Sequence, residues 1–168
     1  FDVTSKTILT TDASNKGLRA TSSQIKEGSE HIVAFASRIL KGAELNYSTI
    51  EKEALASYWG IKHFQFYLWG IPFSLRTDHK PLVPVFSTKG IERATPRISK
   101  WLVGLQSFNF QMEYVPGTKS VVADCLSRLP TSLSEVTKYN DGVDVLKIDV
   151  PAISKEDWAL HISNDKIL

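Results

Sequence analysis

Two segments of the sequence run like β-strands and then end on an aspartate. The first, TILTTDASNKG at 7–17, reaches Asp12, and the second, FSLRTDHKPL at 73–82, reaches Asp78. Aspartate disfavours strands and is costly to bury, so a chain that ends two β-type runs on this residue needs a place for both side chains. The two positions therefore predict strand ends that water or a cation can reach.

The periodicity of the first 130 residues predicts an α/β fold of the α+β type, a mixed sheet flanked by helices. Alternating and β-branched runs indicate strands, whereas an apolar period of 3.6 residues indicates helices. The first three strands are joined by short loops and should pair antiparallel, while the last two follow helical crossovers and should lie parallel to the first. The expected strands are 6–12, 18–25, 31–40, 73–78 and 109–115, and the expected helices are 47–68, 96–108 and 121–129.

This topology is expected to bring the two aspartates together. Parallel strands end at the same rim of a sheet, where ligands of such sheets bind, so Asp12 and Asp78 should lie side by side. Adjacent carboxylates repel each other unless a cation lies between them, and hard divalent ions such as Mg²⁺ prefer oxygen ligands. The sequence thus predicts a metal site at this rim.

The long predicted helix offers two further acids, Glu51 and Glu53. They lie at opposite borders of its apolar face, so the helical period does not choose between them. Glu51 stands three residues after Ser48, in the spacing of a capping box, whereas Glu53 has no such local role and is favoured as the ligand. In the last predicted helix, Asp124 lies off the apolar stripe, where an exposed first-turn acid near the helix dipole is the ordinary interpretation.

Charge is distributed unevenly along the chain. Residues 1–128 hold 16 Lys and Arg against 11 Asp and Glu, whereas residues 129–168 hold 4 against 7. A basic body suits a polyanionic partner such as nucleic acid, although a solvated basic face is the plain alternative. The change of character near Pro130 divides the chain into a compact domain over 1–130 and an acidic, partly helical extension over 131–168. No apolar stretch is long enough to predict a membrane span.

Five stretches of the chain carry a family resemblance: TDASNKG, IVAFASRIL, AELNYSTIEKEALA, FSLRTDHKPL and RISKWLVGLQSFNFQMEYVPGTKSVVADCLSRLP. In order and spacing they resemble the ribonuclease H domain of gypsy-type LTR-retrotransposon Pol polyproteins, over roughly 6–130. The resemblance implies a ribonuclease H-like fold with four metal ligands, Asp12, Glu53, Asp78 and Asp124. It also implies two Mg²⁺ ions about 4 Å apart, with Asp12 bridging them and Mn²⁺ as a possible substitute.

The activity that the resemblance implies is metal-dependent endonucleolytic hydrolysis of the RNA strand in an RNA–DNA hybrid during reverse transcription. RNA would be distinguished by its 2′-OH groups, and the DNA strand would be held through its backbone. For Trp101 the alternative is a core or helix-face aromatic. The candidate substrate contacts are Ser14, Asn15, Arg97, Lys100 and Trp101.

Two positions bear on how this chain would use such a site. Ten residues before Asp124, where cellular ribonucleases H have a mobile His, this chain has Tyr114, as gypsy-type domains usually do. We expect it to be an auxiliary site residue, with a structural strand-end aromatic as the alternative. Its hydroxyl can donate or accept a hydrogen bond but does not shuttle protons near neutral pH. The family usually reads Gly-x-Gly-Ala after the first turn, but here GLRA places Arg19 in the second strand.

Two other functions remain open. Arg19 allows an inactive ribonuclease H-like domain that serves as a hybrid-binding or structural module. A DDE-type nuclease of the same superfamily would need a late Glu, and Glu113 stands 35 residues after Asp78. The polyprotein context implies reverse transcriptase and integrase as neighbours in the same chain. It also implies a cytoplasmic location in virus-like particles, or a nuclear one.

Overall fold

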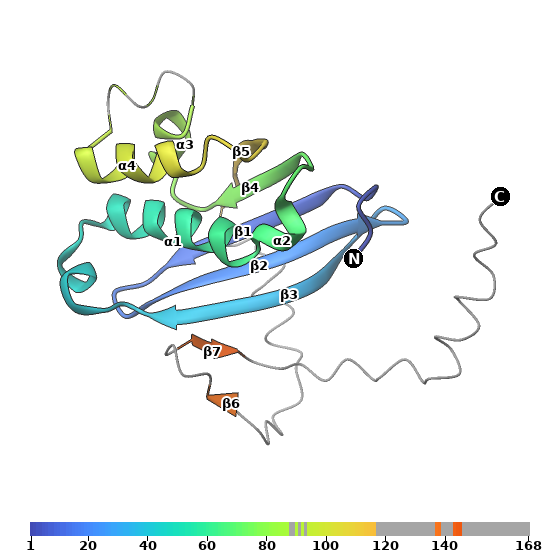
Figure 1. Ribbon diagram of the computed structural model, residues 1–168, viewed down its shortest axis with the longest axis horizontal. Coiled ribbons are helices and arrows are strands. Elements are labelled where there is room, and N and C mark those ends of the chain that lie inside the picture. Colours follow the sequence, from blue (N-terminus) through green and yellow to red (C-terminus); the bar gives the residue numbers. More distant parts are fainter. Residues whose placement is uncertain (88–89, 91, 93, 117–136, 139–142, 146–168) are drawn as a thin grey trace.

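The computed structural model describes residues 1–87, 90, 92, 94–116, 137–138 and 143–145. Its centre is a mixed β-sheet with the strand order β5-β4-β1-β2-β3-β7-β6 (Figure 1). The first five strands of the chain are β1 Thr7–Ala13, β2 Gly17–Lys26, β3 Ser29–Ile39, β4 Phe73–Thr77 and β5 Phe110–Tyr114. All five expected strands are present, with ends within two residues of the predicted ones.

The strand directions confirm the predicted mixed sheet. β2 pairs antiparallel with both β1 and β3, whereas β4 lies parallel to both β1 and β5. The β2–β3 hairpin turns through Glu27 and Gly28, whose φ angles of 51° and 77° are both positive. Such two-residue turns match the twist of the strands that they join.

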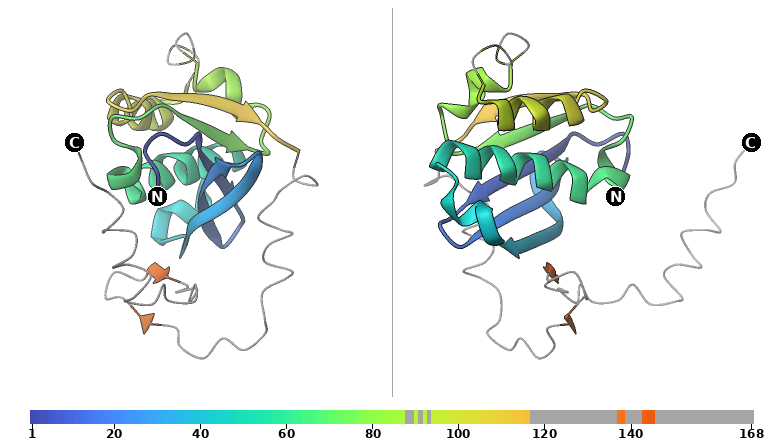
Figure 2. Two further views of the ribbon diagram at one scale, coloured as in Figure 1. Left: turned by 90° about the vertical axis from the view of Figure 1, so that its right-hand side faces the viewer. Right: turned by 60° about the vertical axis from the view of Figure 1, so that its left-hand side comes forward.

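The helices follow the third strand in the chain and pack on the sheet. A 3₁₀ turn, η1 Gly42–Asn46, leads into α1 Thr49–His63 and the short α2 Gln65–Leu68; α3 Leu82–Val85 and α4 Pro96–Gly104 follow β4. α1 lies over β1 and β2, with α4 beside it (Figures 1 and 2). Leu9, Leu75, Ile61 and Leu105 are all buried in the core that forms between these layers. Burying such apolar side chains drives the helices onto the sheet.

Two predicted helices are shorter than expected. The helix predicted over 47–68 breaks at Phe64 (φ −93°, ψ 17°), and the ring of this residue lies in the core, so α1 and α2 are separate. The helix predicted over 96–108 ends at Gly104, because the Leu105 N–H bonds to the carbonyl three residues back and tightens the last turn. The single turn of α3 was not predicted.

The predicted helix 121–129 and most of the extension 131–168 lie outside the described residues. From the extension the structure describes β6 Thr137–Lys138 and β7 Val143–Val145, which pair antiparallel with each other. β7 also pairs antiparallel with β3 and so extends the edge of the sheet. The division of the chain at residue 130 stays a prediction. Among the described residues, no helix combines the length and the apolar character needed to cross a membrane.

Candidate metal site

Three acidic side chains converge where β1 and β4 end. Asp12 is the next-to-last residue of β1, Asp78 directly follows β4, and Glu53 lies in the second turn of α1. Each offers a carboxylate oxygen, and these oxygens all lie within 4.8 Å of one another. The parallel register that sets Thr7 opposite Phe73 brings the two aspartates level at the rim of the sheet.

Of the two helix acids, Glu51 is engaged elsewhere. It accepts hydrogen bonds from the Ser48 backbone N–H (3.1 Å) and hydroxyl (2.9 Å), and it forms an ion pair with Arg97 (2.6 Å). Glu53 is 4% exposed, and its Oε2 is buried without a hydrogen-bond partner in the described part of the chain. The structure therefore places Glu53, and not Glu51, in the cluster.

The close approach of α1 to the sheet brings Glu53 to the strand ends. At Gly60 a Cβ atom would lie 2.9 Å from Thr11 Cγ2 and 3.1 Å from Ala20 Cβ, so this contact needs glycine. One turn earlier, the buried hydroxyls of Ser57 and Thr11 share a hydrogen bond of 3.1 Å. Because Thr11 precedes the first aspartate of the cluster, these contacts fix the helix against the strand that carries it.

The electrostatics of the cluster favour a bound cation. Burial and then the charges of Asp12 and Asp78 together raise the pKa of Glu53 to about 8. Burial and then the charge of Asp78 raise the pKa of Asp12, while Arg19 acts in the opposite direction. Carboxylates that resist ionisation together are stabilised by a cation between them. Three carboxylate donors fit a hard divalent ion, all the more because one of them, Glu53, has a buried oxygen without a partner among the described residues.

Arg19 faces this cluster from β2. It stands directly opposite Asp12 in the β1–β2 pair, with its Nη1 3.7 Å from Asp12 Oδ2. The Arg19 side chain is 64% exposed and that of Asp12 is 44% exposed. Arg19, which stands where the Gly-x-Gly-Ala pattern has its second glycine, thus places a cation beside one of the three acids.

Comparison with known proteins gives the family. Residues 2–108 match the family described as "RNase H-like domain found in reverse transcriptase". The chain belongs to this family. It is 34% identical over 157 residues to the retrovirus-related Pol polyprotein from transposon opus of Drosophila melanogaster, and 41% identical over 146 residues to that from transposon 297. These matches cover 93% and 85% of this chain but only 15% and 13% of the two polyproteins.

Solved structures show the same fold. The foamy viral protease-reverse transcriptase in complex with RNA/DNA hybrid has a TM-score of 0.50 at 18% identity, covering 82% of this chain and 18% of that one. The N-terminal RNase H domain of Rv2228c from Mycobacterium tuberculosis, a fusion with maltose binding protein, has a TM-score of 0.52 at 14% identity. That match covers 73% of this chain and 91% of the other. At these identities the likeness establishes an RNase H fold.

In this RNase H-like domain, Ser14 and Asn15 lie in the turn that follows the first acid. Ser14 Oγ accepts hydrogen bonds from the backbone N–H groups of Lys16 (3.2 Å) and Gly17 (3.0 Å), so it holds the turn. Asn15 is exposed, and its Oδ1 accepts a hydrogen bond from Lys52 Nζ (3.5 Å). Lys52 is only 9% exposed and was not predicted, because lysines are rarely buried and no sequence pattern marks this one.

The candidates on α4 differ in how free they are to meet a substrate. The Arg97 guanidinium lies 4.0 Å from the centre of the Tyr47 ring, besides its ion pair on α1. Trp101 packs 6.1 Å, between ring centres, from both Tyr47 and Tyr58. These contacts agree with the alternative that Trp101 is a packing aromatic. Lys100 is exposed.

Tyr114 ends β5 near the cluster. It stands opposite Thr77, the residue before Asp78, in the parallel pair of β4 and β5, and the residue is 43% exposed. The RNase H-like domain thus presents a phenol on the strand next to the second aspartate. Asp124, the fourth expected ligand, lies outside the described residues.

Glu113 takes no part in the acid cluster. It accepts a hydrogen bond from Ser74 (2.8 Å) and pairs with Arg76 (3.2 Å), which also pairs with Glu30 (2.8 Å). This polar network joins β3, β4 and β5 across one face of the sheet. A DDE-type site with Glu113 as its last acid therefore lacks support.

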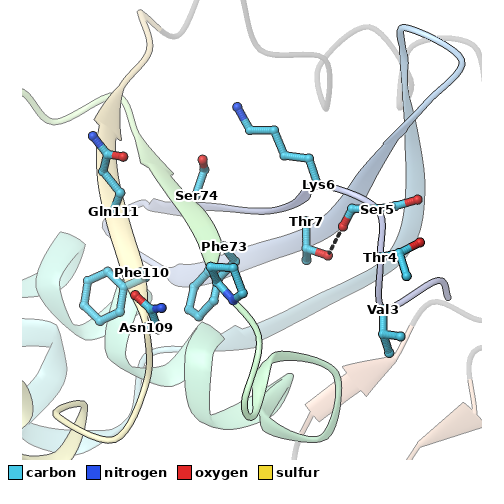
Figure 3. Close-up of a pocket in the computed structure, with 11 residues that line it drawn as sticks. Val3, Thr4, Ser5, Lys6, Thr7, Phe73, Ser74, Asn109, Phe110 and Gln111 are labelled. Atoms are coloured by element: carbon cyan, nitrogen blue, oxygen red, sulfur yellow. Dashed lines mark hydrogen bonds between the residues drawn. The ribbon is translucent and has the colours of Figure 1, made fainter.

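A shallow hollow of about 450 Å³ lies at the other ends of the parallel strands (Figure 3). Segments 3–7, 72–74 and 109–111 line it. Lys6 is the only ionisable side chain among the lining residues, so the hollow offers no set of catalytic groups. In the described parts of the RNase H-like domain, the chemistry that the sequence predicts gathers at the carboxylate rim instead.

Proposed function

We propose that this domain is a metal-dependent endonuclease that hydrolyses the RNA strand of RNA–DNA hybrids within the Pol polyprotein of a gypsy-type LTR retroelement. The observation that carries the proposal is the convergence of Asp12, Glu53 and Asp78 at one rim of an RNase H fold. The family membership supports it, and so does a fold neighbour whose structure was solved with an RNA/DNA hybrid. Because the chain spans about a seventh of its polyprotein relatives, the activity of the whole protein is part of the proposal.

The proposed cofactors are two Mg²⁺ ions, with Mn²⁺ as a substitute. Asp12 would be shared between the ions, Glu53 and Asp78 would complete one set, and Asp124, outside the described residues, would complete the other. Divalent ions bound there supply Lewis acidity for phosphodiester hydrolysis. Glu53 Oε2 is buried and has no hydrogen-bond partner among the described residues, which supports a direct role in this set.

The surroundings of the cluster suit a hybrid duplex. Asn15, held by the Lys52 ammonium, is exposed in the turn beside the acids and can reach a sugar or base edge. Lys100 on α4 is exposed and suits a backbone phosphate. The Tyr114 hydroxyl would assist by hydrogen bonding near Asp78.

A second function, an inactive hybrid-binding or structural module, is favoured by one observation. Arg19 puts a guanidinium 3.7 Å from an acid of the cluster. In either case the domain would follow reverse transcriptase and precede integrase in the polyprotein. It would act in cytoplasmic virus-like particles or in the nucleus.

The test is cleavage of a labelled RNA–DNA hybrid by the 168-residue chain with Mg²⁺, with Mn²⁺ and with EDTA. The native chain is compared with Asp78→Asn and with Glu27→Gln, a matched acid-to-amide change at the exposed hairpin turn on the opposite end of the sheet. Metal-dependent cutting of the RNA strand by the native chain and Glu27→Gln, lost in Asp78→Asn, is the expected result. Hybrid binding measured in EDTA separates substrate affinity from catalysis.

Two results would contradict the proposal. If none of the chains cuts while all bind the hybrid, the domain is a binding module. If Asp78→Asn cuts as fast as the native chain, the hydrolysis does not use this cluster.

A further inference from the structure

We infer that Arg19 is a built-in counter-cation of the carboxylate cluster, which stabilises the metal-free domain and competes with divalent ions for Asp12. This inference rests on the proposed metal site and adds its regulation: the domain would need a higher metal concentration than the same cluster without Arg19. The competing group is part of the chain, so the effect is present at any protein concentration.

The sheet register aims Arg19 at the cluster. In an antiparallel pair, directly opposite residues point to the same face, so Arg19 and Asp12 share one side of the β1–β2 pair. The guanidinium Nη1 lies 3.7 Å from Asp12 Oδ2. Its strand neighbours Leu18 and Ala20 are buried against α1, and successive side chains of a strand point to opposite faces, so the arginine lies on the face away from α1.

The ion pair between Arg19 and Asp12 can break as well as form. Its side chain is 64% exposed, and 3.7 Å is a long separation for an ion pair, so solvent screens the attraction. The pair is therefore weak enough for a divalent ion to displace the guanidinium. A displaced arginine on this strand still keeps its charge near the ion, and two cations a few ångströms apart repel each other.

Within the described residues, Arg19 is the cation that pairs with an acid of the cluster, and its partner is Asp12. Lys52, a lysine on α1, donates a hydrogen bond to Asn15. In the absence of metal, Arg19 thus offsets part of the negative charge of Asp12, within a cluster whose carboxylate oxygens all lie within 4.8 Å of one another. Once ions bind, the same charge opposes them.

The test measures metal binding without nucleic acid, by calorimetry with Mn²⁺ and by the rise in melting temperature with Mg²⁺. Arg19→Gln removes the charge, Arg19→Lys keeps it, and Lys26→Gln removes one charge at the far, exposed end of the same strand. Arg19→Gln should lower the Mn²⁺ dissociation constant about three- to tenfold, an effect that shrinks at 1 M salt. In EDTA the melting temperature of Arg19→Gln should fall by about 1–4 °C. Arg19→Lys and Lys26→Gln should stay close to the native chain.

The outcomes separate this inference from the proposed function. If metal binds all four chains with equal affinity, the metal site stands and the role of Arg19 is wrong. The inference also fails if Lys26→Gln tightens binding as much as Arg19→Gln, because the effect would then be net charge alone. If Arg19→Gln instead weakens hybrid binding in EDTA and leaves metal affinity unchanged, Arg19 is a phosphate contact. If no chain binds metal, the proposed metal site fails together with the inference.

Discussion

Replacing Glu53 with Gln should stabilise the metal-free domain at neutral pH. The buried carboxylate has its pKa raised from 4.5 to about 8, first by burial and then by the charges of Asp12 and Asp78. The unfolded chain ionises this group above about pH 4.5, whereas the folded chain keeps it protonated up to about pH 8. Between these values the folded state binds more protons, so the free energy of unfolding falls as the pH rises. A glutamine carries no charge in either state and escapes this penalty.

The size of the effect follows from the shift. At pH 7 the Glu53 carboxylate must take up a proton when the native chain folds. Because the pKa of this group in the unfolded chain, 4.5, lies about 2.5 units below the pH, this protonation costs about 3 kcal/mol. Glu53→Gln should therefore raise the free energy of unfolding at pH 7 by about 3 kcal/mol, or the melting temperature by about 6–12 °C. Near pH 4.5 the gain should almost disappear.

Urea and thermal unfolding in EDTA at pH 4.5, 7 and 8.5 measure this difference. Glu27→Gln, an acid-to-amide change at an exposed turn, is the control and should change stability by less than about 0.5 kcal/mol. Added Mg²⁺ should stabilise the native chain and should have much less effect on Glu53→Gln. An equal gain at pH 4.5 and pH 7, or no gain at pH 7, would refute the assignment of Glu53 to a buried, charge-repelled site.

Two further changes test the framework around the cluster. Gly60→Ala should lower the free energy of unfolding by about 1–3 kcal/mol and weaken metal binding. The reason is that the new Cβ would meet Thr11 Cγ2 at 2.9 Å and push α1 away from β1. An unchanged melting temperature would contradict the close approach of α1 to the sheet. Arg76→Met should cost about 1–2 kcal/mol at pH 7, because it leaves Glu30 and Glu113 without their cation. Hydrogen bonds from Ser74 and Arg76 hold the pKa of Glu113 below its usual value. The loss of stability in Arg76→Met, measured by urea unfolding, should therefore fade as the pH falls below about 4 and Glu113 becomes protonated. A loss of stability that does not depend on pH would argue against the ion pairs.

Much of the fold was predictable because strands, helices and turns depend on local sequence patterns. The two-residue and 3.6-residue periods located the five strands and the two main helices, and the order of elements predicted which strands run parallel. The spacing of Ser48 and Glu51 predicted the start of α1, and the structure has the predicted capping box there. The helix ends were less predictable, because the break at Phe64 comes with the burial of its ring in the core and not from a breaker residue.

The candidate site was predictable in part for the same reason. A strand that ends on Asp is a local signal, and two such strands running parallel must end at one rim. By contrast, the alternative roles of Arg97 and Trp101 depend on contacts with Tyr47 from another part of the chain. Composition and helical period carry no information about such partners, so the substrate candidates on α4 were the weakest predictions.

The sequence by itself determined that Asp12 and Asp78 end neighbouring strands and that Glu51 caps a helix, because turns, caps and periods depend on residues close together in the chain. Only the tertiary structure decided that Glu53 reaches both aspartates, with an oxygen that has no partner in the described parts of the chain, and that Arg19 faces Asp12. These relations depend on strand register and on how closely a helix approaches a sheet. Both are set by packing among residues far apart in the chain, so no local pattern records them.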